Sequence, residues 1–273
     1  MNKLVLLVMG VLLVNLAMAQ TTISFFEEFP NESTLEKVLE IDFDTRIYLA
    51  ANNLSEFYKY EQQIRNTSKH VQEVVYWPVL SIEEGYWISP WSDREALERI
   101  FIEMQHNDAP LEVMLDLEMP KKRSRMFLWG EFKENKGYIS TFINASKDYN
   151  ITITTVEKAW IPDPILKRFG LAFDSGVDHK RIKMFYSSFG RKYLPDLWMD
   201  KLFEKKMKKF KKREIIPAIG CIDVGIHGNE PLNSPEILKR ELEIVRKNDL
   251  PEAVVFRFSG LNQEYLKTIQ NVY

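Results

Sequence analysis

The sequence predicts a single (β/α)8 barrel, in which eight parallel strands each lead into a helix. Strand-like and helix-like segments alternate along the chain with little interruption. The 273 residues suit this fold, which typically needs about 250. No linker-like Gly/Ser-rich or Pro-rich stretch and no long repeat divides the chain. An open doubly wound sheet is the competing fold, but no G-x-G-x-x-G follows the first strand.

The first nineteen residues are predicted to be a secretory signal peptide. Lys3 precedes the apolar run 4–13, and Ala17-Met18-Ala19 supplies a small-x-small cleavage site before Gln20. The apolar run is short for a membrane span, although an uncleaved anchor is the alternative. We therefore expect residues 20–273 to form the barrel domain, secreted and without a stable membrane span after cleavage.

Composition limits the function classes. A net charge of −2 argues against nucleic acid as the main partner. Cys221 is the only cysteine, which excludes an internal disulfide and a cysteine-based metal site. Five Asn-x-Ser/Thr triplets suit a secreted glycoprotein, and they begin at Asn31, Asn53, Asn66, Asn144 and Asn150.

The candidate strands are short runs rich in β-branched and aromatic residues. In order they are residues 23–29, 45–51, 73–80, 111–117, 151–156, 181–187, 214–223 and 253–258. The candidate helices carry apolar residues three and four positions apart. In order they are residues 31–39, 54–65, 92–101, 124–149, 165–169, 194–212, 234–248 and 262–272.

Local signals support several of these boundaries. Asn31 to Thr34 resembles a capping sequence, Ser92-Asp93 opens a later helix, and Pro235 suits a first helical turn. Pro78 suggests that the third strand pairs weakly near its end. The lysine-rich helix 194–212 is expected to expose a solvated basic face, with a polyanion or membrane patch as the alternative.

The fourth candidate strand, L-E-V-M-L-D-L-E-M-P from residue 111, carries the chemistry. Asp116 and Glu118 are two residues apart, so on a strand both side chains point to the same face. The apolar run before them is typical of a strand buried on both faces in a parallel sheet. Acids at the carboxyl end of such a strand lie where barrel enzymes keep their active sites. The alternative is that these acids only cap a loop or bind an arginine.

Other polar and aromatic residues end the remaining strands and should meet at the same rim. Aromatic faces stack on sugar rings, and paired acids cleave glycosidic bonds, so this rim suits a carbohydrate. The candidate substrate-binding residues are Glu28, Trp77, Trp87, Glu157, Asp223 and Arg257. His227 follows the seventh strand, and a lone loop histidine is expected to have no special role. No ligand spacing supports a metal site, and no cofactor is predicted.

Three segments resemble motifs of the chitinase-like glycoside hydrolases of family 18. Residues 115–120 (LDLEMP) are similar to the end of that family's D-x-x-D-x-D-x-E strand. Residues 81–85 (SIEEG) resemble its Ser-x-Gly-Gly element, and 184–187 (MFYS) its Met-x-Tyr-Asp/Asn element. The resemblance implies a barrel glycosidase with Glu118 as general acid. It also implies that Asp116 and Tyr186 position the N-acetyl group of the substrate.

The chain departs from the family pattern at several positions. Leu111 and Met114 replace the earlier acids of the motif, Ser187 replaces the acid after Tyr186, and Glu83-Glu84 replace the glycine pair. We therefore predict a secreted glycoside hydrolase with Glu118 as general acid. The alternative is a catalytically inactive barrel that binds a glycan or a protein.

Overall fold

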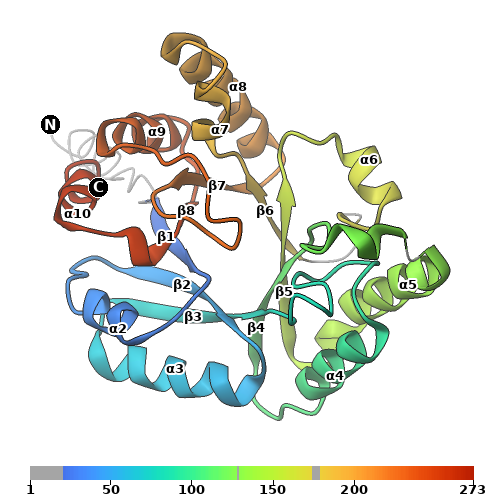
Figure 1. The fold of residues 1–273 in the computed structure, drawn as a ribbon. Coiled ribbons are helices and arrows are strands. Elements are labelled where there is room, and N and C mark those ends of the chain that lie inside the picture. Colours follow the sequence, from blue (N-terminus) through green and yellow to red (C-terminus); the bar gives the residue numbers. More distant parts are fainter. Residues whose placement is uncertain (1–20, 128, 174–178) are drawn as a thin grey trace, which may run out of the picture.

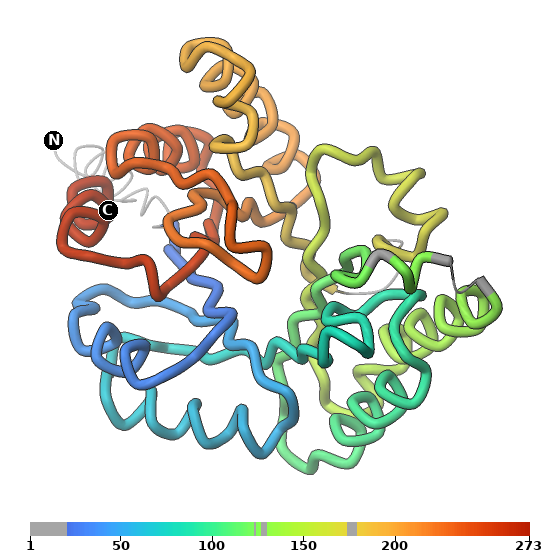
Figure 2. The backbone as a smooth tube through the Cα atoms, in the orientation of Figure 1, coloured from blue at the N-terminus to red at the C-terminus, as the bar shows by residue number. Residues whose placement is uncertain are grey.

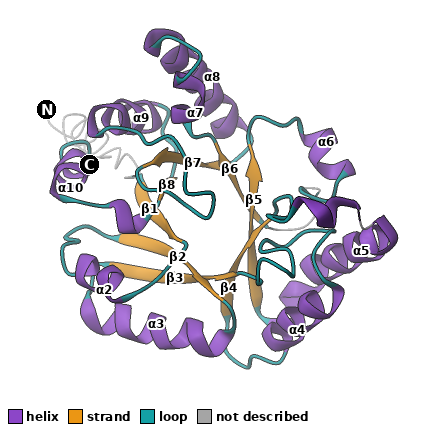
Figure 3. Ribbon diagram, in the orientation of Figure 1, coloured by secondary structure: helices purple, strands orange, loops and turns teal. Residues whose placement is uncertain are grey.

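The computed structural model describes residues 21–127, 129–173 and 179–273. Within these ranges, eight parallel strands form a closed barrel in chain order, and the helices surround it (Figures 1 and 3). The predicted (β/α)8 barrel is thus confirmed. The predicted signal peptide, residues 1–19, lies outside the described residues. None of the described helices is long and apolar enough to cross a membrane.

The elements follow the predicted order. The strands are β1 (Thr22–Glu27), β2 (Thr45–Ala51), β3 (Val71–Pro78), β4 (Leu111–Asp116), β5 (Ile151–Lys158), β6 (Lys180–Met184), β7 (Ile215–Cys221) and β8 (Glu252–Phe256). The α-helices are α2 (Glu32–Val38), α3 (Leu54–Thr67), α4 (Arg94–Gln105), α5 (Trp129–Ala145), α6 (Asp163–Arg168), α7 (Ser187–Arg191), α8 (Asp196–Lys212), α9 (Pro235–Lys247) and α10 (Gln263–Gln270). Short 3-10 helices are η1 (Arg123–Phe127), η2 (Ser146–Tyr149) and η3 (Phe258–Gly260).

The barrel closes where the first and last strands pair. β1 pairs in parallel with β8 from Thr22 opposite Glu252 to Phe26 opposite Phe256. Figure 2 shows the result, because the chain passes once around the ring and its blue start lies beside its red end. Closure leaves no free strand edge, and it brings the carboxyl ends of all eight strands to one rim.

Side chains alternate between the inside of the barrel and the layer under the helices. Phe26, Met114 and Val156 belong to the inner apolar cluster. Phe25, Val113 and Leu115, their neighbours in sequence, belong to the outer cluster that packs against the helices. Both faces are therefore buried, which explains why the strands are almost continuously apolar.

Two boundaries illustrate how local chemistry fixes the elements. Asn31 caps α2, since its side chain accepts hydrogen bonds from Ser33 N and Thr34 N, as the capping sequence predicted. The sixth strand is shorter than predicted and ends at Met184. Ser187 instead begins α7, where its hydroxyl donates a hydrogen bond to the buried carboxylate of Glu241.

A buried carboxylate crosslinks the amino-terminal end of the barrel. Glu252 accepts hydrogen bonds from Ser24 Oγ at 2.7 Å and from Tyr48 Oη at 2.9 Å. Arg46 Nη1 lies 3.0 Å from the other carboxylate oxygen. Three strands, β1, β2 and β8, thus share one charged acceptor at the point where the barrel closes.

We expect Tyr48→Phe to lower the free energy of unfolding by about 1.5 kcal/mol, because it removes one donor to a buried charge. Tyr76→Phe is the matched control. Tyr76 is also fully buried, but its hydroxyl has no hydrogen-bond partner among the described residues. Urea unfolding should show Tyr76→Phe within about 0.5 kcal/mol of the unsubstituted protein. Equal losses in both variants would contradict the role assigned to Glu252.

Candidate functional site

A cavity of about 310 Å³ opens at the carboxyl ends of the strands. This is the rim where barrel enzymes bind their substrates. Its polar lining residues are Glu28, Asp116, Glu118, Lys158, Tyr186, His227 and Glu230. Its apolar lining includes Phe26, Trp77, Trp87, Met114, Trp160, Met184, Phe189, Ile226 and Phe256. The combination of several carboxylates with aromatic side chains is the one that the sequence predicted for this rim.

Strand alternation places the two acids of β4 together. Met114 points into the barrel, so Asp116 and Glu118 follow it on the same side, and both line the cavity. Their residues expose only 5% and 7% of their surface. The predicted shared face for Asp116 and Glu118 is what the structure has, and among the described residues neither acid has an arginine partner.

Glu118 has a cationic partner that the sequence analysis missed. Lys158 Nζ lies 2.7 Å from Glu118 Oε2, and the lysine side chain is 44% exposed. The predicted fifth strand stopped at Val156, but β5 continues to Lys158. The signal was available, because Val156 points inward and position 158 must then point the same way.

Asp116 is the most strongly perturbed acid of the cavity. Burial raises the pKa of Asp116 well above its ordinary value, and the nearby carboxylates of Glu118 and Glu28 raise it further. Its Oδ1 atom is buried without a hydrogen-bond partner among the described residues. Lys158 opposes the shift but does not cancel it. Asp116 therefore keeps its proton to a higher pH than an ordinary aspartate, next to Glu118.

Glu28 is a second carboxyl group that holds its proton near neutral pH. Its oxygens accept hydrogen bonds from Tyr86 Oη at 2.9 Å and from Ile226 N at 3.1 Å. Burial raises the pKa of Glu28 to about 7, even though both hydrogen bonds favour the charged form. Glu28 and Asp116 are thus two acids of the cavity whose pKa values burial raises.

Tyr186 closes the side of the cavity next to β6. Its ring lies 5.8 Å from Phe256 and 6.4 Å from Phe189. Burial raises the pKa of Tyr186 well above its ordinary value. The phenol therefore stays neutral and can donate a hydrogen bond to a bound molecule.

Two tryptophans form the wall opposite Tyr186. Trp77 packs 5.7 Å from the Phe26 ring, and its Nε1 atom is buried without a hydrogen-bond partner among the described residues. Trp87 lies 5.2 Å from Tyr86 and 5.7 Å from His227. His227, to which the sequence analysis gave no role, thus lines the cavity. Burial lowers the pKa of His227, and the cation of Lys121 lowers it further.

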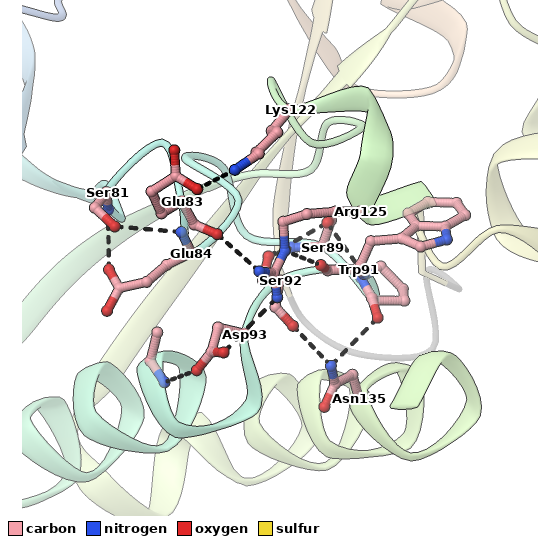
Figure 4. Close-up of polar contacts among 12 residues, drawn as sticks. Ser81, Glu83, Glu84, Ser89, Trp91, Ser92, Asp93, Lys122, Arg125 and Asn135 are labelled. Carbon is pink, nitrogen blue, oxygen red and sulfur yellow. Dashed lines mark hydrogen bonds and ion pairs between the residues drawn. The ribbon is translucent and has the colours of Figure 1, made fainter. Parts of the chain in front are cut away.

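The loop that carries Trp87, residues 79–93, is fixed by hydrogen bonds from the next βα unit (Figure 4). Arg125 donates from Nε and Nη1 to two backbone carbonyls of this loop, at 2.9 and 2.7 Å. Asn135 Nδ2 donates to Ser92 O at 2.9 Å, and Ser92 Oγ donates to Trp87 O at 2.7 Å. These hydrogen bonds therefore fix the backbone of the loop that carries Trp87.

Three of the predicted substrate-binding residues lie outside the cavity. Glu157 points outward between Val156 and Lys158, and its carboxylate is paired with Arg181 at 2.6 Å. Asp223 and Arg257 form an ion pair with each other, and neither lines the cavity. Strand alternation explains Glu157, because it is the immediate neighbour of the inward-facing Val156 and Lys158 and therefore points to the opposite face. Glu28, Trp77 and Trp87 do line the cavity, as do Asp116, Glu118 and Tyr186.

The described residues contain no group of three or more His, Cys, Asp or Glu side chains placed to hold a metal ion. Cys221 also lines the cavity, and burial raises the pKa of its thiol to about 12. A thiol that keeps its proton is a poor nucleophile. The chemistry of the cavity therefore depends on its carboxyl groups, Lys158 and Tyr186.

No protein-family model matches the sequence, and no curated protein matches it. Solved structures with the same fold do match. A xylose isomerase domain protein from Planctomyces limnophilus has a TM-score of 0.53 at 10% identity, covering 92% of this chain and 96% of that one. The catalytic domain of beta-amylase from Paenibacillus polymyxa has a TM-score of 0.51 at 9% identity, covering 91% and 95%. A D-tagatose 3-epimerase-like protein has a TM-score of 0.50 at 13% identity, covering 92% and 96%.

These likenesses support the (β/α)8 fold and, at such low identity, the fold alone. They include a glycosidase and proteins named for sugar isomerisation or epimerisation. The resemblance of three segments to family 18 hydrolases stays a prediction.

The raised pKa of Glu28 predicts a pH-dependent stability. Between pH 4.5 and 7 the unfolded chain loses this proton while the folded protein keeps it, so the folded state is progressively disfavoured. At about 1.4 kcal/mol per pH unit, Glu28 should cost about 3 kcal/mol above pH 7 and nothing below pH 4.5. Glu28→Gln cannot ionise, so urea unfolding at a series of pH values should show a smaller loss with rising pH. Parallel curves for the two proteins would contradict this assignment.

Proposed function

We propose that this protein is a glycoside hydrolase, and that Asp116 and Glu118 form its catalytic pair. The observation that carries the proposal is the joint position of these acids in one aromatic-lined cavity at the carboxyl ends of the strands. A hydrolase of this kind must protonate the leaving oxygen and stabilise the positive charge that develops on the sugar. A pair of acids that shares one proton can do both.

The electrostatics of the pair support a division of labour. Lys158 forms an ion pair with Glu118, whereas burial raises the pKa of Asp116, whose Oδ1 atom has no hydrogen-bond partner among the described residues. We infer that Asp116 stores the proton in the free protein and passes it to Glu118 when a substrate displaces Lys158. Glu118 then donates this proton to the leaving oxygen as the glycosidic bond breaks, and the Asp116 carboxylate stabilises the positive charge that develops on the sugar. Water then adds to the sugar and gives one proton back to the pair.

The remaining lining residues suit a sugar. Trp160 lines the cavity with 47% of its surface exposed, so its ring offers a stacking surface, and the nearly buried Trp77 and Trp87 add apolar lining. By the family 18 resemblance, Tyr186 and Asp116 would hold an N-acetyl group of the substrate. The fold shared with the catalytic domain of a beta-amylase is compatible with this class of reaction.

We further propose that the protein is secreted, through the signal sequence predicted for residues 1–19. The five asparagines of the Asn-x-Ser/Thr triplets are all exposed, which a glycosylated secreted protein requires. The proposal extends to glycan attachment at these asparagines in a host with the necessary enzymes.

A second candidate function is the binding of a glycan or protein without turnover. The ion pair between Lys158 and Glu118 favours it, because a carboxylate held by a cation at 2.7 Å is a poor proton donor. The two candidates differ in whether Lys158 leaves Glu118 when a ligand binds.

Glu118→Gln tests the catalytic assignment. Gln keeps the shape of the side chain but has no proton to donate, so we expect hydrolysis to fall by about 100- to 10,000-fold while the fold is retained. A panel of chromogenic glycosides and polysaccharides, with circular dichroism as the folding check, measures both. Glu83→Gln is the control, because Glu83 is an exposed acid whose partner is Lys122. Turnover in Glu118→Gln equal to that of the control would remove the assignment, and a protein inactive on the whole panel would favour the binding function.

Lys158→Met tests the pairing. Without this cation the Asp116–Glu118 pair should keep its last proton to higher pH, so the basic limb of the pH–rate profile should move up by about one unit. Lys121→Met is the matched control, since Lys121 contacts Ile226 O and His227 Nδ1 instead of the two acids. A basic limb that stays in place in Lys158→Met, or moves as far in Lys121→Met, would contradict the proposed role of the pair.

A further inference from the structure

A second hollow lies on the outer side of the barrel, between the segment after β5 and helix α8. Its volume is about 480 Å³. We call it the cationic groove, and the residues that border it include Asp163, Lys183, Lys206, Lys209, Phe210 and Arg213. Figure 1 shows α6 and α8 both on the outside of the barrel, beside strands β5 and β6.

Cations outnumber carboxylates at this groove. Arg181, Lys183 and Arg213 form ion pairs with Glu157 and Asp163. These two acids are therefore already shared among three cations. Lysines 206 and 209 of α8 have no carboxylate partner in the described part of the chain, so the groove keeps a net positive charge.

The excess of positive charge at the groove affects the environment of Lys206. Its Nζ atom donates to Ala159 O at 2.9 Å and lies 5.6 Å from the ring centre of Phe185. A carbonyl and an aromatic face only partly compensate a charge that is half-buried. Burial lowers the pKa of Lys206, and the positive charges of Lys209 and Lys183 lower it further. An anion placed among these ammonium groups would relieve the repulsion.

The donors point to a compact anion. Lys183 comes from β6, Lys206 and Lys209 from one face of α8, and Arg213 from just after its end. Ammonium groups are point charges with several donors each, and they suit tetrahedral oxyanions such as sulfate and phosphate. Trp160, which is 47% exposed, borders this groove as well as the carboxylate cavity. A ring attached to the anion can therefore lie along the indole.

We propose that the cationic groove between α6 and α8 is a binding site for a sulfate or phosphate group, free or as the ester of a larger molecule. Lys206 and Lys209 supply the uncompensated charge, and Lys183 and Arg213 complete the donor set. The proposal stands on the groove itself and does not depend on hydrolysis in the other cavity.

Isothermal titration of the mature protein with sodium sulfate and with sodium phosphate, each against sodium chloride at equal ionic strength, tests the site. We expect millimolar or tighter binding of the divalent oxyanions with a stoichiometry near one. Lys206→Met combined with Lys209→Met should weaken binding at least about tenfold, because it removes both unpaired cations. Titration with glucose 6-sulfate and glucose 6-phosphate shows whether the site takes the free ion or an ester. Tighter binding of an ester than of the free ion identifies an ester site, and equal or weaker binding identifies a site for the free ion.

The matched control is Lys205→Met combined with Lys212→Met. It removes the same charge from exposed positions of the same helix that do not border the groove. Its affinity should stay within about twofold of the unsubstituted protein. Absence of binding in the unsubstituted protein would overturn the proposal. So would unchanged affinity in the groove variant, or an equal loss in the control variant.

Discussion

The strict alternation of side chains along eight closed, parallel strands is the constraint on which the rest of this structure depends. Because the barrel has no free edge, every strand residue points either into its interior or into the layer under the helices. Met114, Asp116 and Glu118 face inward together, as do Val156 and Lys158. Glu157 faces outward and meets Arg181. One residue of displacement along a strand would exchange the two sets, so register alone decides which charges meet.

This constraint separates two charged regions that share the wall formed by β5 and β6. Inside the rim, the carboxyl groups of Glu28, Asp116 and Glu118 are in excess over one lysine, and burial raises the pKa of Glu28 and of Asp116. Outside the wall, cations are in excess over Glu157 and Asp163, and Lys206 and Lys209 have no carboxylate partner among the described residues. Burial makes both imbalances costly, which is why such groups are associated with binding and catalysis.

Packing behind the cavity also matters for its chemistry. The loop with Trp87 is fixed by side chains from the following βα unit, Arg125 and Asn135, through hydrogen bonds to backbone carbonyls. Tyr86, in the same loop, donates to Glu28. A change in the packing of this loop therefore reaches the protonation of an acid on another strand. Such indirect support is common at sites that need fixed geometry.

The sequence by itself determined the fold class, the order of the strands and helices, and the shared face of Asp116 and Glu118. Each of these follows from local pattern: hydrophobic periodicity, capping residues and the two-residue repeat of a strand. Only the tertiary structure decided that Lys158 pairs with Glu118, that Glu28 loses its contact with water, and that Asp223 and Arg257 bind each other outside the cavity. These outcomes depend on which strands become neighbours, how far each one extends past the rim, and which loops cover it. These outcomes are set by long-range distances and by burial, and a local sequence pattern determines neither.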